Sequence, residues 1–340
     1  MRALVFTGPG EMPLRERDDP RPGAGQVVVA VRAAGICGSD VHGYLGATGR
    51  RRPGVVMGHE AAGDVVAIGP AVTSVRMGDR VALRSILACG RCERCRRGQS
   101  NVCTDRQGMG MHFDGAYAER ILVPESLLLP LPDTLSYEDG ALIEPLAVAM
   151  HAVNRTPFEL MDFVVVIGAG AIGLLTLLAA RLRGAGSVVV TDLSSHRLEV
   201  ARALGADLTI DVGSTDPVAA IAAATEGRGA DAVFEAVGVS ATVAQSLAVA
   251  RAGGQVTWVG NSAPVVEMPM QALVTGELTV RGAYGFVQEF EQAADALAAG
   301  WIDARRLVEC VAPLEDGPEL FRRLGDSSLA AVKVILVPNG

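Results

Sequence analysis

The hydrophobic positions follow one pattern in the first third of the chain and another in the rest. Up to about residue 130, short apolar runs alternate with dense glycine and proline. That pattern is typical of a folded-over, mostly antiparallel β domain. We therefore predict strands over residues 3–7, 26–35, 61–69, 79–83 and 118–123.

From about residue 140, short apolar runs are separated by segments rich in alanine and leucine. Alternation of buried strands with helices predicts a parallel, doubly wound sheet. A helical pattern over 290–300 and an apolar strand over 330–338 follow, and we expect them to return to the first domain. The predicted strands of the parallel sheet cover 163–168, 187–192, 231–238 and 255–260.

Length and charge limit the classes of protein. A chain of 340 residues exceeds the usual size of one core, so two domains are expected. The net charge of −8 argues against broad binding of nucleic acid or anionic membranes. The N-terminus shows no signal-peptide pattern, and the long apolar run 163–182 contains clustered glycines, so we expect a cytoplasmic protein. Lys333 is the only lysine, which we interpret as compositional bias.

A glycine pattern marks a nucleotide site. Gly168, Gly170 and Gly173 form G-x-G-x-x-G, with Ala171 and Ile172 inside the motif, between a predicted strand and a predicted helix. The glycines allow a tight turn, close approach of a pyrophosphate and close packing of helix on strand. The N-terminus of the following helix supplies N–H groups to the anion.

Asp192 ends the second predicted strand, at about the distance from the glycines where a carboxylate binds the adenosine ribose of NAD. It would repel the 2′-phosphate of NADP, so NAD is the expected cofactor. Arg197 lies five residues further on and weakens this preference, since an arginine there can pair with that phosphate.

Four of the six cysteines fall within residues 89–103, as C-x2-C-x2-C-x7-C. In a reducing compartment such a cluster holds metal more often than it forms disulfides. Four thiolates can enclose one tetrahedral zinc ion, and an iron–sulfur cluster is the rival interpretation. These residues are Cys89, Cys92, Cys95 and Cys103.

A second group of ligand-type residues stands upstream. Cys37 lies in GICGSDVH with Ser39 and His42, and His59 and Glu60 lie in the segment GHEAAG. One cysteine, one histidine and a carboxylate from separate loops make an open zinc site with a position for substrate.

Together these segments resemble the zinc-dependent medium-chain dehydrogenase/reductase family, in its sorbitol- and polyol-dehydrogenase-like branch. GICGSDVH, GHEAAGDVVAIG, the four-cysteine segment, GAYAER, ALIEPLAVAMHAV and VIGAGAIGLL occur in the family's order over nearly the whole chain. The resemblance implies an α/β fold: a Rossmann domain inserted in a mostly β, GroES-like catalytic domain with a structural zinc lobe. The implied ranges are 1–148 and 284–340 for the catalytic domain, 149–283 for the NAD-binding domain and 86–105 for the lobe.

The resemblance also implies roles for individual residues. Cys37 and His59 would bind a catalytic zinc, Glu60 would bind it or lie beside it, and Glu144 falls where sorbitol-type members place a glutamate. Ser39 would take the substrate proton, and His42 would deliver it to solvent. Asp40 would orient a ligand such as His59. With the four-cysteine lobe, two zinc ions per chain are expected.

The implied reaction is hydride transfer between NAD(H) and a secondary alcohol, diol or polyol. Gly43 stands where well-matched sorbitol dehydrogenases have an aromatic residue, and Gly285 and Phe286 replace an arginine–tyrosine pair, which favours a simpler alcohol than sorbitol. L-Threonine and butanediol are alternative substrates. A zinc-free quinone or enone reductase and a non-catalytic relative are alternative functions. By analogy we also expect a homodimer or homotetramer, without nucleic-acid or membrane partners.

Overall fold

A computed structural model describes residues 1–47 and 49–339. The chain divides into two compact units, Met1–Glu144 with Phe290–Gly340, and Pro145–Glu289. The expected boundary at 148 falls inside helix α3 (Tyr137–Arg155), and that at 283 falls between strand β15 (Thr279–Gly282) and helix α9 (Glu289–Ala298). The last residue of the expected catalytic domain, residue 340, lies outside the described residues.

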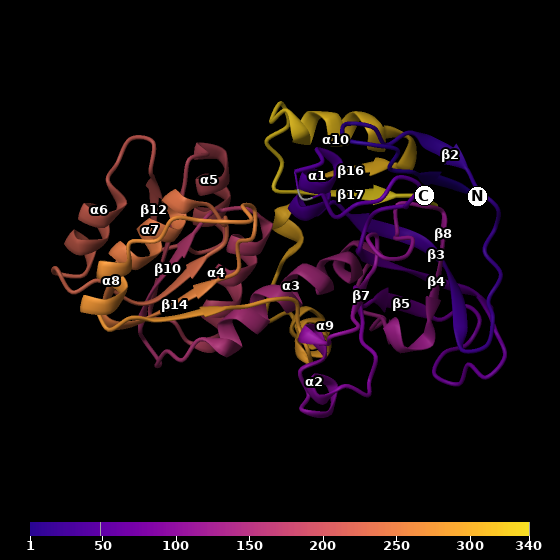
Figure 1. The fold of residues 1–340 in the computed structure, drawn as a ribbon, viewed down its shortest axis with the longest axis horizontal. Coiled ribbons are helices and arrows are strands. Elements are labelled where there is room, and N and C mark those ends of the chain that lie inside the picture. The colour runs from indigo at the N-terminus through magenta and orange to yellow at the C-terminus, as the bar shows by residue number, and fades with distance from the viewer. Residues whose placement is uncertain (48, 340) are drawn as a thin grey trace. The chain divides into compact units, whose positions relative to one another are not determined.

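The first unit is built on a mixed sheet of seven strands in the order β16-β17-β3-β4-β5-β9, with β8 also paired to β3 (Figure 1). Neighbouring pairs among β3, β4, β5 and β9 are antiparallel, as predicted. The strands are β3 (Gln26–Gly35), β4 (Glu60–Ile68), β5 (Arg80–Leu83), β8 (Arg120–Pro124), β9 (Leu128–Pro130), β16 (Val308–Pro313) and β17 (Lys333–Val337).

The end of the chain completes this sheet. Strand β17 pairs antiparallel with β3, with Ile335 opposite Gly35, and β16 lies parallel on the outer side of β17. The last strands of the chain thus belong to the sheet of the first unit. Shorter elements of this unit are β1 (Arg2–Leu4), β2 (Leu14–Glu16), α1 (Gly38–Tyr44), β6 (Ile86–Leu87), α2 (Glu93–Arg96), β7 (Gln107–Gly108) and α10 (Gly317–Gly325).

The core of the first unit comes from alternate residues of its strands. Val27, Val29 and Val31 of β3 are fully buried on one face, where they pack with apolar residues of β4 and β8. Tyr117 and Phe321 are also buried, with their ring centroids 5.5 Å apart in an edge contact. Such aromatic pairs add to the apolar burial that stabilises the sheet.

The second unit is a parallel sheet of six strands in the order β12-β11-β10-β13-β14-β15 (Figure 1). The order reverses at β10, whose neighbours are β11 and β13, so the switch point follows the glycine strand. The strands are β10 (Phe163–Ile167), β11 (Ser187–Asp192), β12 (Leu208–Asp211), β13 (Ala230–Glu235), β14 (Ala250–Trp258) and β15. The helices are α4 (Ala171–Arg183), α5 (Ser195–Ala203), α6 (Pro217–Ala224), α7 (Ser240–Ala248) and α8 (Met270–Thr275).

The apolar run 163–182 is thus a strand, a glycine turn and most of a helix, as predicted. No helix in the described part of the chain is both long and apolar enough to cross a membrane.

Candidate active site

Three ligand-type side chains lie together in the first unit, next to the end of strand β3 and the start of its neighbour β4. Cys37 precedes α1, just after β3, while His59 and Glu60 stand at the start of β4. Gly35 of β3 lies opposite Glu60 of β4, so the antiparallel register brings these segments together. One potential ligand atom from each of Cys37, His59 and Glu60 lies within 4.8 Å of the others. Sulfur, imidazole nitrogen and carboxylate oxygen are the usual ligands of zinc.

Glu60 is buried and bonded on one side only. Its Oε2 accepts a hydrogen bond from Lys333 Nζ at 2.7 Å, whereas its buried Oε1 has no hydrogen-bond partner among the described residues. A buried oxygen without a partner is costly unless something else binds it. A cation beside Cys37 and His59 would satisfy this oxygen, so the donor set fits a metal ion.

Lys333 has a role that the sequence analysis missed. It extends from β17, its side chain is 1% exposed, and it also donates to the carbonyl of Ile36 at 3.2 Å. Burial opposes its charge, but the charges of Glu60 and Cys37 outweigh burial and raise the pKa of Lys333. The interpretation of this lysine as compositional bias was therefore wrong. Its position inside an apolar strand was the available signal.

Asp40 lies behind His59, as expected. Its Oδ2 is 3.3 Å from His59 Nδ1, which leaves Nε2 of the imidazole for a metal. Although burial opposes its ionisation, the charges of His59 and Arg51 and a hydrogen bond from Tyr117 hold the pKa of Asp40 well below its ordinary value. The Tyr117 hydroxyl lies 2.7 Å from Asp40 Oδ2. An ionised carboxylate here fixes the tautomer of the histidine.

Glu144 lies apart from the three clustered donors but in their electrostatic field. It stands on α3, is buried, and accepts a hydrogen bond from Ser85 Oγ at 2.6 Å. Burial raises the pKa of Glu144, the charge of His59 opposes this rise, and that of Glu60 adds to it. The two carboxylates thus interact electrostatically, and Glu60 is the one in the donor cluster.

The expected proton carriers follow Cys37 on α1. Ser39 is exposed, with its Oγ 3.3 Å from Cys37 Sγ, and His42 is half-buried one turn further along. The short helix therefore places a hydroxyl beside the thiol and an imidazole closer to its other end.

The four clustered cysteines form a second, separate donor set, with one sulfur from each within 4.8 Å of the others. Sγ of Cys92 lies 3.5 Å from Sγ of Cys95 and 3.8 Å from Sγ of Cys103, too far for a disulfide. Backbone N–H groups of Cys95 and Thr104 lower the pKa of the Cys92 thiol to about 5. Four converging sulfurs, one of them on a thiol that ionises easily, suit a closed zinc centre.

The glycine turn of the second unit has the geometry that its motif predicts. Gly168 has φ +97°, and a Cβ at Gly173 would lie 1.7 Å from the carbonyl oxygen of Gly168. Gly170 precedes α4, and Ala171 and Ile172 begin it. Asp192 ends β11 beside this turn: its Oδ2 accepts from Ala169 N at 2.6 Å and its Oδ1 from Ser194 N at 2.8 Å. Arg197 lies in the first turn of α5, where its backbone N–H donates to Ser194 Oγ.

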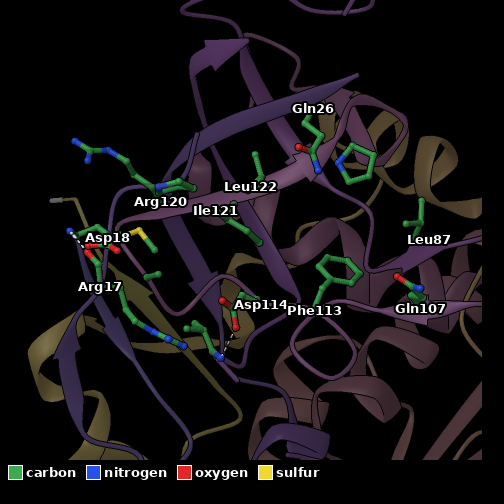
Figure 2. A pocket seen from close by; sticks show the side chains of 16 residues that line it. Arg17, Asp18, Gln26, Leu87, Gln107, Phe113, Asp114, Arg120, Ile121 and Leu122 are labelled. Atoms are coloured by element: carbon green, nitrogen blue, oxygen red, sulfur yellow. Dashed lines mark hydrogen bonds between the residues drawn. The ribbon is translucent and has the colours of Figure 1, made fainter. Parts of the chain in front are cut away.

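A hollow of about 530 Å³ lies elsewhere in the first unit, and no residue of either donor set lines it (Figure 2). Arg17, Asp18 and Arg120 gather at one end of it, and Leu87 and Gln107 at the other. Asp114 also lines this hollow and accepts a hydrogen bond from the backbone of Val56, so its oxygen supports the loop that leads to His59.

Comparison with known proteins identifies the family. Residues 23–133 match the model of the alcohol dehydrogenase GroES-like domain, and residues 171–299 match that of the zinc-binding dehydrogenases. Sorbitol dehydrogenase of Bacillus subtilis (strain 168) is 33% identical over 100% of this chain and 98% of its own. The chain belongs to the zinc-dependent medium-chain dehydrogenase family, in its polyol dehydrogenase branch.

Two further relatives show the range within the family. L-Threonine 3-dehydrogenase of Saccharopolyspora erythraea is 38% identical over 84% of each chain. A zinc-binding dehydrogenase of Sinorhizobium meliloti 1021, solved with NADP, is 34% identical, has a TM-score of 0.93 and is matched over 99% of both chains. This dehydrogenase is thus an alcohol or polyol oxidoreductase with the family's fold.

The buried ion pair between Lys333 and Glu60 leads to a first prediction. Lys333→Met removes the cation and leaves Glu60 as a buried charge without its partner. We expect the free energy of unfolding to fall by about 3–5 kcal/mol, measured by chemical denaturation. The double variant Glu60→Gln/Lys333→Met should lose less, because no buried carboxylate charge remains there. An equal or larger loss in the double variant would contradict this explanation.

Proposed function

We propose that the chain is an NAD-dependent zinc dehydrogenase that interconverts a secondary alcohol, diol or polyol and its ketone. The observation that carries this proposal is the convergence of Cys37, His59 and Glu60, where one buried oxygen of Glu60 has no hydrogen-bond partner among the described residues. Zinc held by these residues, with Glu144 beside them, would supply a Lewis acid that lowers the pKa of the substrate hydroxyl.

The chain's own residues handle the proton. Ser39, with its hydroxyl at the thiol of Cys37, is placed to take the proton of the alcohol. His42 is half-buried and lies further along the same helix, so it is suited to pass the proton to solvent. An imidazole serves this step because its unperturbed pKa lies near neutrality.

NAD is the proposed cofactor. The support is Asp192, a carboxylate at the end of β11 whose backbone partners hold it beside the glycine turn. Its negative charge opposes a 2′-phosphate. Two observations favour NADP instead: Arg197 lies nearby in sequence, and the solved relative from Sinorhizobium meliloti binds NADP.

The substrate is proposed to be less hydroxylated than sorbitol, because Gly43, Gly285 and Phe286 replace bulky or polar residues of sorbitol-type pockets. A zinc-free reductase accounts poorly for the chain, since both donor sets are assembled. A non-catalytic relative would have no need of Ser39 beside the Cys37 thiol.

A second copy of the chain is the proposed protein partner. Strand β15 lies at the edge of the six-stranded sheet, and nearby α8 leaves Met270 and Val274 60% and 64% exposed. An open strand edge with apolar side chains favours pairing between subunits. Sedimentation of the purified chain measures this directly. The proposed location is the cytoplasm, because four cysteines gathered at metal-binding spacing are typical of a reducing compartment.

Metal analysis tests the two zinc sites. The purified protein should contain about two zinc ions per chain, and Cys37→Ser and Cys95→Ser should each remove about one, because each serine breaks one donor set. Cys310→Ser is the matched control, since this cysteine belongs to neither set. Two zinc ions retained in Cys37→Ser would exclude that thiol as a ligand.

A substrate panel tests the reaction. With NAD⁺, the protein should oxidise at least one member of a set of polyols, vicinal diols, simple secondary alcohols and amino alcohols, measured by NADH absorbance. Cys37→Ser should fall to background, while Cys310→Ser should keep its activity. Activity that survives in Cys37→Ser would remove the metal site from the mechanism.

Cofactor choice is tested at Asp192. Asp192→Ser removes the charge that repels the 2′-phosphate, so the ratio of kcat/KM for NADP⁺ to that for NAD⁺ should rise roughly tenfold, or about 1.4 kcal/mol. Asp211→Ser is the control, because Asp211 also ends a strand and accepts a backbone N–H, from Gly213. An unchanged ratio in Asp192→Ser would show that another residue selects the cofactor.

A further inference from the structure

Arg51 is a buried cation that the reaction described above does not use. It is the middle residue of three consecutive arginines, and it lies between α1 and β4. Its side chain is 8% exposed, whereas Arg52 beside it is exposed. An arginine buried to this degree is rare unless its charge is paired.

The guanidinium reaches the carboxylate that lies behind the metal site. Arg51 Nη2 donates to Asp40 Oδ1 at 2.9 Å, and Asp40 itself is fully buried. The other oxygen, Oδ2, faces His59 Nδ1 at 3.3 Å and the hydroxyl of Tyr117 at 2.7 Å. Arg51 and His59 therefore contact opposite oxygens of the same carboxylate.

A missing side chain on α1 makes room for this arginine. A Cβ at Gly43 would lie 2.9 Å from Arg51 Cγ and 3.1 Å from its Nε. Arg51 Nε is buried and has no hydrogen-bond partner among the described residues, so packing against Gly43 and one bond to Asp40 hold the guanidinium. The absence of a side chain at Gly43 therefore leaves the space that the arginine fills.

We propose that Arg51 is a positioning residue of the catalytic metal site: it holds Asp40 in place, and Asp40 in turn holds His59 with Nε2 directed at the zinc. This inference rests on the proposed function. The physical reason is that a buried carboxylate needs a partner that fixes it, and the neutral Tyr117 hydroxyl supplies only one hydrogen. Groups that orient a ligating histidine typically alter metal affinity by about 10–100-fold.

Zinc retention provides a test that does not depend on turnover. The full-length enzyme loaded with zinc is mixed with a chromogenic chelator, and the release of each zinc is followed in time. Arg51→Met should release one of the two zinc ions about 10–100-fold faster, while the four-cysteine site serves as an internal reference. Arg52→Met, an exposed neighbour with the same change in charge, should behave like the wild type.

Two further variants separate positioning from general destabilisation. Asp40→Asn should speed release of the same zinc, and Arg51→Met/Asp40→Asn should add little to that effect, because both residues act through one path. Additive effects of the two substitutions would overturn the proposal. Gly43→Ala should displace the guanidinium and speed release of that zinc with all charges retained, so it provides the test if Arg51→Met does not fold.

The outcomes distinguish this inference from the proposed function. If the wild type holds two zinc ions and reduces NAD⁺, but Arg51→Met and Gly43→Ala release zinc at the wild-type rate, only the role of Arg51 is wrong. If the wild type holds a single zinc and Cys37→Ser retains it, the catalytic site itself is wrong. Substitution of cobalt gives a second readout, because the visible spectrum of cobalt at the catalytic site should change in Arg51→Met and not in Arg52→Met.

Discussion

The pairing of β3 with β4 places three potential metal ligands next to each other, and with them several buried charges. Gly35 faces Glu60 across the ladder, and a Cβ at Gly35 would lie 2.2 Å from Glu60 Oε2. A side chain at position 35 would force the carboxylate of Glu60 to move. Charges gathered in an interior are expensive unless each finds a partner. The surroundings of the site can be understood as the set of partners that this pairing requires.

These partners come from distant parts of the sequence. Lys333 reaches Glu60 from the last strand, and Arg51 reaches Asp40 from the loop before β4. The return of the chain end to the first sheet therefore has a chemical as well as an architectural consequence. Without β17, the carboxylate of Glu60 would lack its cation. The fold of the first unit therefore also determines which charges surround the candidate metal site.

Local patterns predicted the fold and the residues that the structure groups as potential metal donors. The glycine turn depends on residues a few positions apart, and the four cysteines lie within one short segment, so their spacing carried the information. Lys333 and Glu60 are 273 positions apart, and neither has a pattern around it that points to the other. Arg51 stands among three arginines that look alike in sequence, and only the structure separates the buried one from its exposed neighbour. Long-range pairs of single charges are what sequence patterns reveal least.

Gly43 and Arg51 pack so closely that a side chain added at one position must displace the other. A Cβ at position 43 would lie 2.9 Å from Arg51 Cγ, so a side chain there would force the arginine to shift. The absence of a side chain at Gly43 thus admits a cation that donates a hydrogen bond to Asp40. If Gly43 helps to select the substrate, as proposed, the same position also bears on the residues behind the candidate metal site. Substrate preference and zinc retention should then be coupled in this chain, because both depend on the absence of a side chain at Gly43.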